Sequence, residues 1–142
     1  EILIGLVGSE MCIRDSLDAG QAAASSNIID RLILPRIHPQ VVEAINMSSA
    51  PERLHALGVM EFFSVTAAIM AADAAAKAAD IVLLEIRLGT GIGGKSFVTM
   101  TGDVSAVTAS VDAGIKSAED SGMVLDSVVI AHPDPELYRH LL

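Results

Sequence analysis

The sequence predicts an α/β protein of the α+β kind, with a ferredoxin-like split βαβ arrangement in which two helices cover one face of a four-stranded antiparallel sheet. Three observations predict it. Four short apolar runs rich in β-forming residues have the length and composition of strands. Two long segments between them, the first almost all alanine, have the composition of helices. Glycine, proline and aspartate mark the junctions, so the expected order is β-α-β-β-α-β-α.

The first strand and helix are predicted from residue 56 onward. Residues 56–63 (ALGVMEFF) form an apolar run that is typical of a strand. Ser64 follows and is expected to be an N-cap, so a helix is expected over residues 65–79. On this helix Asp73 and Lys77 stand one turn apart and can form an ion pair.

The second half repeats this pattern. Asp103 is expected to cap the second long helix, and Gly122 is expected to end it. Pro133 and Pro135 precede a short, added C-terminal helix. The remaining elements are expected as a strand at 81–87, a glycine loop at 89–94, a strand at 96–101, a helix at 104–121, a strand at 124–131 and the C-terminal helix at 136–142.

Composition and charge exclude several classes of partner and site. The net charge of −9 argues against nucleic acid and anionic membranes as partners. No apolar run approaches the roughly 20 residues of a transmembrane helix. The single cysteine, Cys12, excludes an internal disulfide, and the four histidines show no metal-ligand spacing, so no metal site is predicted.

An internal repeat predicts how the chain is organised. Segments near residues 17–38 recur about 95 residues later, which is the size of a whole small domain. Residues 17–46 are therefore expected to be the C-terminal remnant of a first domain, 47–53 a linker, and 54–142 a complete second domain. Residues 1–16 are expected to be non-native, because residues 10–16 (EMCIRDS) resemble a translated sequencing adapter. Within the remnant, residues 28–34 are expected to be a strand without its partners. The matched segments are Leu17-Asp18-Ala19-Gly20 with Val111-Asp112-Ala113-Gly114, residues 29–34 with residues 125–130, and His38-Pro39 with His132-Pro133.

A glycine-rich stretch matches two phosphate-binding patterns. Residues 89–96 (GTGIGGKS) fit G-x-x-x-x-G-K-[ST], and Gly89, Gly91 and Gly94 also fit G-x-G-x-x-G. Both patterns bind phosphate because the last glycine opens a helix whose N–H groups point at the anion. Here the residues after Lys95 alternate and favour a strand, so a nucleotide-binding enzyme that uses Gly89 to Ser96 is the disfavoured alternative.

Several spaced motifs resemble a bacterial microcompartment shell domain. The similarity runs without a gap over about residues 54–142, and residues 17–46 resemble the end of the same domain. Together they resemble a tandem-domain shell protein of the propanediol-utilisation type, a class also found in ethanolamine-utilising compartments. The motifs are Ala56-Leu57-Gly58-Val59-Met60-Glu61, residues 71–79, residues 102–107, Val111-Asp112-Ala113-Gly114 and residues 128–133.

The resemblance implies a structural role and no enzymatic activity. Such proteins form homotrimers of two-domain chains, which are pseudohexameric tiles in the shell of a cytoplasmic polyhedral organelle. They contact other shell proteins directly and the encapsulated enzymes indirectly. The family's pore loop corresponds to Thr90, Gly91, Ile92, Gly93, Gly94 and Lys95, whose backbone donors and lysine suggest small polar or anionic solutes. The family's tile-edge contacts correspond to Lys77, His132 and Pro133.

Two features depart from the family pattern. The first-domain remnant keeps an edge arginine, Arg36, but the equivalent turn in the second copy has none, which leaves that contact open. Some tandem members hold an iron–sulfur cluster at the pore through a first-domain cysteine. No cofactor is expected in this chain, whose loop ends in Lys95-Ser96 without a thiol; an electron-transfer tile stays possible for a longer parent with the missing first domain.

Overall fold

The computed structural model describes residues 10–47, 55–90 and 94–137. The chain divides into two compact units, residues 1–36 and 37–142. The first unit contains α1 (Glu10–Ala24) and the short 3₁₀ helix η1 (Ser25–Asn27). Helix α1 runs through the predicted junction at residue 16 without a break. The predicted boundaries of the non-native segment, the remnant and the linker stay predictions.

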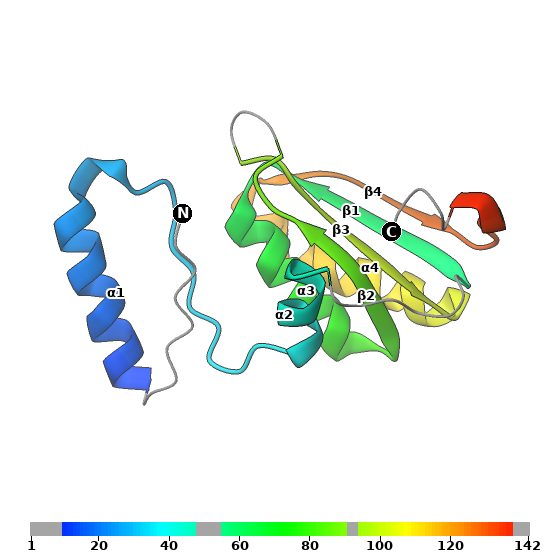
Figure 1. Ribbon diagram of the computed structural model, residues 1–142, viewed down its shortest axis with the longest axis horizontal. Coiled ribbons are helices and arrows are strands. Elements are labelled where there is room, and N and C mark those ends of the chain that lie inside the picture. The colour runs from blue at the N-terminus through cyan, green and yellow to red at the C-terminus, as the bar shows by residue number, and fades with distance from the viewer. Residues whose placement is uncertain (1–9, 48–54, 91–93, 138–142) are drawn as a thin grey trace. The chain divides into compact units, whose positions relative to one another are not determined.

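The second unit has the predicted split βαβ topology (Figure 1). A four-stranded sheet has the order β2-β3-β1-β4, and each neighbouring pair is antiparallel. The fold class and the four strands are therefore confirmed. The elements in chain order are α2 (Pro39–Ile45), β1 (Ala56–Phe62), α3 (Val65–Ala78), β2 (Ile81–Arg87), β3 (Ser96–Gly102), α4 (Val104–Ala118), η2 (Glu119–Ser121), β4 (Val124–Ile130) and η3 (Pro135–Leu137).

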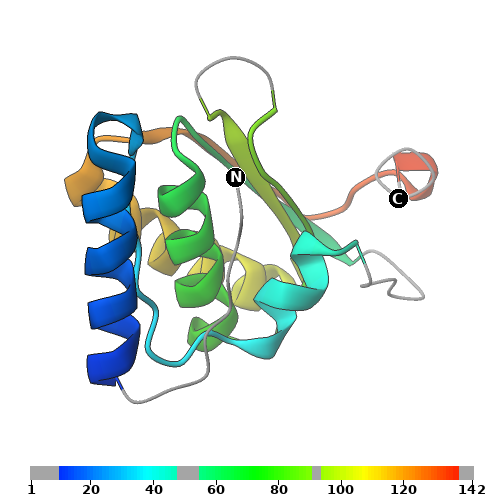
Figure 2. The ribbon, with the colours of Figure 1, turned by 60° about the vertical axis from the view of Figure 1, so that its left-hand side comes forward.

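Helices α3 and α4 lie on the same face of the sheet (Figures 1 and 2). The Ser64 hydroxyl accepts a hydrogen bond from the Ala67 amide, which confirms it as the N-cap of α3. The alanines of α3 allow a close approach to α4. At Gly114 an added Cβ would lie 2.7 Å from Met60 Sδ and 3.0 Å from the carbonyl oxygen of Ala71, so glycine is required there.

The strands place alternate side chains on the two faces of the sheet. Gly58 lies under α4, since an added Cβ would meet Val107, Met100 and Val111. The helix-facing core includes Met60, Phe62, Leu83, Val98 and Met100, all fully buried. The opposite face carries residues that alternate with these. They are Leu57, Val59 and Glu61 in β1, Phe97, Thr99 and Thr101 in β3, and Asp126, Val128 and Ile130 in β4.

Helix α2 packs in the second unit, against β2 and α3. Its side chains Val41 and Ala44 are fully buried. The side-chain amide of Gln40 donates to the Ile81 carbonyl at 3.1 Å and accepts from the Leu83 amide at 2.9 Å. Gln40 therefore satisfies backbone groups along the outer edge of β2, where another strand could otherwise pair.

The structure differs from the sequence predictions in several details. Residues 28–34 form no strand, because a strand is defined by pairing and no partner strand adjoins them in the described part of the chain. Asp103 stands at the N-cap position of α4, but its carboxylate makes no capping bond; the helix begins with the Val107 amide donating to the Asp103 carbonyl. The second long helix ends at Ala118 and continues as η2 to Gly122, whose φ of 66° ends it as predicted.

Of the C-terminal helix expected at 136–142, the structure describes only residues 136 and 137, which belong to the 3₁₀ turn η3; residues 138–142 lie outside the described residues. No described helix is long and apolar enough to cross a membrane.

Candidate functional site

The loop between β2 and β3 is held at its base by backbone and hydroxyl hydrogen bonds. The Thr90 amide and hydroxyl both donate to the Lys95 carbonyl, at 2.7 and 2.9 Å. The Gly89 amide donates to the Ser96 hydroxyl, which itself donates to the Gly94 carbonyl. Gly89 and Gly94 have φ values of 68° and 78°, which glycine adopts without strain. Thr90, Gly94 and Lys95 are thus placed together; the predicted loop residues Gly91, Ile92 and Gly93 lie outside the described residues.

This geometry excludes the phosphate-binding alternative. Ser96 is the first residue of β3, and all seven residues to Gly102 pair with β1. A nucleotide-binding loop needs a helix at this point, because the helix N-terminus supplies the N–H groups and the dipole that bind phosphate. Gly89 to Ser96 therefore form a glycine-rich connection between two strands.

Lys95 is paired with a residue that sequence reasoning missed. Its ammonium lies 2.7 Å from the Glu61 carboxylate, and the two side chains are 44% and 31% exposed. Glu61 is in β1, and it is opposite Phe97 in the register with β3. Only strand pairing brings these residues together, since they are 34 positions apart in the sequence.

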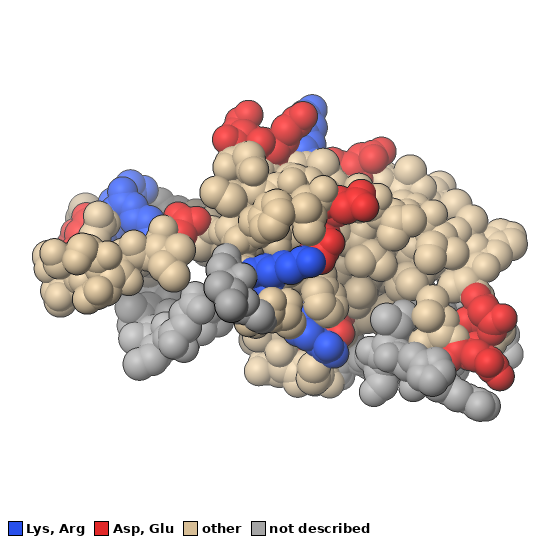
Figure 3. Space-filling view, turned by 90° about the horizontal axis from the view of Figure 1, so that it is seen from above, with Lys and Arg blue, Asp and Glu red and all other residues tan. Residues whose placement is uncertain are grey.

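A second ion pair lies on β2. The Arg87 guanidinium contacts the Glu85 carboxylate at 2.6 Å and lies over the Phe97 ring, 5.3 Å from its centroid. Arg87 is opposite Phe97 in the register of β2 and β3. The two ion pairs therefore share the sheet face opposite the helices, next to the loop. In the space-filling view several basic side chains lie directly beside acidic ones, and most of the surrounding surface is uncharged (Figure 3).

Lys77 forms the predicted ion pair with Asp73. Asp73 is 6% exposed, and its other oxygen accepts a hydrogen bond from the His38 backbone amide at 2.7 Å. One carboxylate thus binds both the exposed end of α3 and the segment that leads into α2. The second of these contacts was not predictable from helix spacing.

We expect Asp73→Ala to lower the free energy of unfolding of the second unit by about 1.5–3 kcal/mol, because the partly buried His38 amide loses a charged acceptor. Urea unfolding followed by circular dichroism measures it. Lys77→Ala is the matched control and should cost about 0.3–0.5 kcal/mol, the value of a helix surface pair. Equal losses in both variants would show that the bond to His38 contributes nothing.

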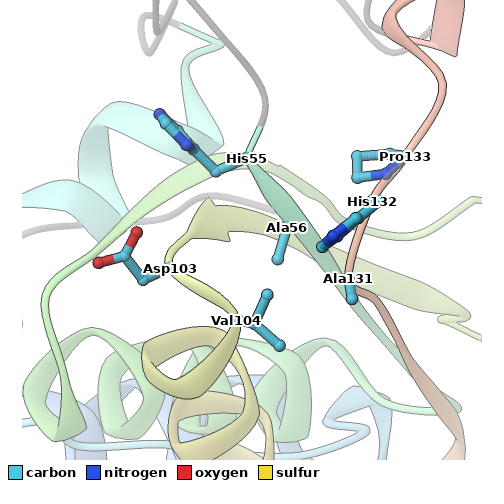
Figure 4. Close-up of a pocket in the computed structure, with 7 residues that line it drawn as sticks. All are labelled: His55, Ala56, Asp103, Val104, Ala131, His132 and Pro133. Atoms are coloured by element: carbon cyan, nitrogen blue, oxygen red, sulfur yellow. The ribbon is translucent and has the colours of Figure 1, made fainter.

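His132 and Pro133 follow β4 and line a surface pocket of about 350 Å³ (Figure 4). The pocket also includes His55 and Ala56 at the start of β1, and Asp103 and Val104 at the start of α4. His132 is exposed and Pro133 half-buried. These residues are far from Lys77 in the chain, and the structure does not bring them into one site with it in a single copy.

The residues of the loop do not fit an iron–sulfur cluster. Such clusters are held by cysteine thiolates, and the only cysteine of the chain, Cys12, is exposed in the first unit. Within residues 10–47, 55–90 and 94–137, no group of three histidine, cysteine, aspartate or glutamate side chains could hold a metal ion.

Comparisons with known proteins agree on one family. The model of the BMC domain family matches residues 56–133. The bacterial microcompartment shell protein PduT of Citrobacter freundii is 32% identical over 142 residues, which are 100% of this chain and 77% of that protein. The shell protein PduA of Salmonella typhimurium is 39% identical over 87 residues, which are 61% of this chain and 89% of that protein.

The solved structures include a similar fold. A microcompartment protein from Desulfitobacterium hafniense has a TM-score of 0.84 to this chain and 46% sequence identity. The match covers 93% of this chain and 73% of the other.

Proposed function

Because the chain belongs to the BMC domain family, we propose that it is a structural subunit of a bacterial microcompartment shell and catalyses no reaction. Its place would be the shell of an organelle in the bacterial cytoplasm, among other shell proteins. The observation that carries the proposal is an exposed apolar surface on the sheet. Helices α3 and α4 cover one face of the sheet (Figure 2). Apolar side chains stay exposed on the other face and at its edge.

The exposed apolar surface centres on β4. This strand pairs on one side only, with β1. Val128 and Ile130 lie on the face opposite the helices and are 49% and 38% exposed. Val82 at the far side of that face is 39% exposed. An apolar edge strand is a typical site of contact with another chain, which here would be a neighbouring subunit.

The repeat supplies a second argument for a homotrimer. His38-Pro39 precedes and opens α2, whose Val41 and Ala44 are fully buried, and the helix packs against β2 and α3. The repeat equates these residues with His132-Pro133, which open a segment that is exposed or half-buried throughout residues 131–137. The same kind of tail is thus docked in one copy and undocked in the other. In a trimer of tandem chains the second tail would dock on the next subunit, which gives a pseudohexameric ring.

The loop that contains Thr90, Gly94 and Lys95 would face the centre of this ring. Each chain would contribute one such loop from this domain, and metabolites would pass between them. The encapsulated enzymes would be partners only through the metabolites that they exchange with the outside.

Lys77 provides the test of tiling. We expect Lys77→Ala in the full-length protein to abolish flat sheets in electron micrographs, because neighbouring tiles would lose their edge contact. The trimer, measured by analytical ultracentrifugation, should persist, and stability should fall by less than about 0.5 kcal/mol. Lys116→Ala, on the exposed part of α4, is the matched control and should leave the sheets intact.

Two results would contradict these proposals separately. Sheets that persist in Lys77→Ala would refute the edge role alone. A wild-type protein that stays monomeric at high concentration and forms no sheets would refute the shell role.

A further inference from the structure

The charged residues beside the loop form a compact group, which we name the loop-end cluster: Glu61, Glu85, Arg87, Lys95 and Asp126. Its core is a row across the sheet in which Arg87 stands opposite Phe97, Phe97 opposite Glu61, and Glu61 opposite Asp126. Lys95 joins the row from the loop through its ion pair with Glu61. The cluster therefore lies where a solute that approaches the loop would meet it.

The two cations of the cluster are already neutralised. Arg87 is held between the Glu85 carboxylate and the Phe97 ring. Lys95 is held by Glu61 at 2.7 Å, and its backbone is fixed by the two bonds from Thr90. Asp126 adds a third carboxylate, which accepts a bond from the Ser127 amide and has no cation partner among the described residues. Three carboxylates against two cations leave the cluster with one excess negative charge.

The setting of the Glu61–Lys95 pair restricts how the two groups can separate. Glu61 is on a central strand with partners on both sides, so its backbone cannot move away from Lys95 without breaking the sheet. Both side chains are more than half covered, so water screens them less than it screens a fully exposed pair. An anion in the loop would have to compete with this fixed carboxylate for the same ammonium group.

We propose that Glu61 is the residue that sets the charge preference of the loop. By holding Lys95 in an ion pair, Glu61 prevents the loop from binding anions, and the opening admits neutral or cationic polar solutes in preference to multivalent anions. This proposal differs from the sequence-based expectation that the loop's backbone donors and Lys95 suit small polar or anionic solutes. The preference among solutes rests on the proposed function, because it requires a pore. The masking of Lys95 by Glu61 does not, because both residues belong to one chain.

The test is a titration with inorganic sulfate, a divalent anion, at constant ionic strength. Backbone amide shifts of Gly89, Thr90, Lys95 and Ser96 in transverse-relaxation-optimised NMR spectra report binding, for monomer and trimer alike. The variants are Glu61→Gln, which unmasks Lys95, and Asp126→Asn, which makes the same change of charge in the same row without touching the pair. Lys95→Gln and the double variant Glu61→Gln/Lys95→Gln remove the ammonium group.

We expect Glu61→Gln to bind sulfate at least about tenfold more tightly than the wild type, the effect of restoring a charged donor to an anion. The affinity of Asp126→Asn for sulfate should stay within about twofold of the wild-type value, since water and salt screen the charge of an exposed group. Neither variant that lacks Lys95 should show a saturable shift. Glu61→Asp keeps the charge on a shorter side chain, so its affinity for sulfate should lie between those of the wild type and Glu61→Gln. It replaces Glu61→Gln in the test if that variant does not fold.

Three results would overturn the proposal. They are equal affinity in the wild type and Glu61→Gln, an equal gain in Asp126→Asn, or no sulfate binding in Glu61→Gln and Glu61→Asp. Assembly is measured independently by electron microscopy. A protein that forms no sheets but shows the expected titration would refute the shell role and leave the masking of Lys95 by Glu61 standing.

Discussion

Replacing Phe62 by alanine is expected to lower the free energy of unfolding of the second unit by about 3–5 kcal/mol. Phe62 ends β1, is fully buried, and is the largest completely buried side chain among the described residues. Its ring fills the space beneath the helices, where a smaller side chain leaves a cavity that the close-packed surroundings cannot close. Since small domains have a total stability of about 5–15 kcal/mol, this loss is a large part of the whole.

Phe63 is the matched control for this substitution. It is the next residue, has the same side chain, and is 50% exposed. Phe63→Ala should cost less than about 1 kcal/mol, because little apolar area leaves a buried site. Chemical unfolding of both variants measures the difference. Equal losses would show that the β1 register, which points Phe62 inward, is wrong.

Replacing Gly58 by valine is expected to cost about 3 kcal/mol, although valine favours strands more than glycine does. An added Cβ would lie 2.7 Å from Val107 Cγ1, 2.9 Å from Met100 Cγ and 3.0 Å from Val111 Cγ2. Two of these groups belong to α4, which would have to move away from the sheet. The packing clash should therefore outweigh the strand preference of valine, so that the substitution lowers the free energy of unfolding and does not raise it.

A double-mutant cycle checks this explanation. Val107→Ala alone should destabilise by leaving a cavity, but in the Gly58→Val background it should recover part of the loss, because the new side chain occupies the vacated space. The free energy of unfolding of Gly58→Ala should lie between those of the wild type and Gly58→Val. Strictly additive losses in the cycle would contradict the contact between residues 58 and 107.

Local signals in the sequence predicted most of the fold. The apolar run at 56–63, the cap at Ser64 and the turn at Gly122 lie where the structure has them, because each depends on a few neighbouring residues. The strand after Lys95 was enough to reject a phosphate-binding loop, and β3 confirms that decision. The pair of Asp73 and Lys77 followed from helical spacing alone.

Three local predictions differ from the structure. Residues 28–34 have the composition of a strand but no partner in the described chain, and composition does not supply a partner. The carboxylate of Asp103 is exposed and makes no capping bond, although its position at the helix start was correct. The short η3 replaces the start of the helix expected after Pro135.

The sequence by itself determined the order of elements from residue 56 onward, the split βαβ topology and the family, because these follow from periodicity, turn residues and motifs that lie within short segments. Helices α1 and α2 were not predicted. Only the tertiary structure decided that Glu61 pairs with Lys95, that Asp73 also binds the His38 amide, and that Gln40 covers the edge of β2. Each of these contacts joins residues more than 30 positions apart. They depend on strand register and on the docking of α2, which the packing of the whole domain fixes and no local pattern encodes.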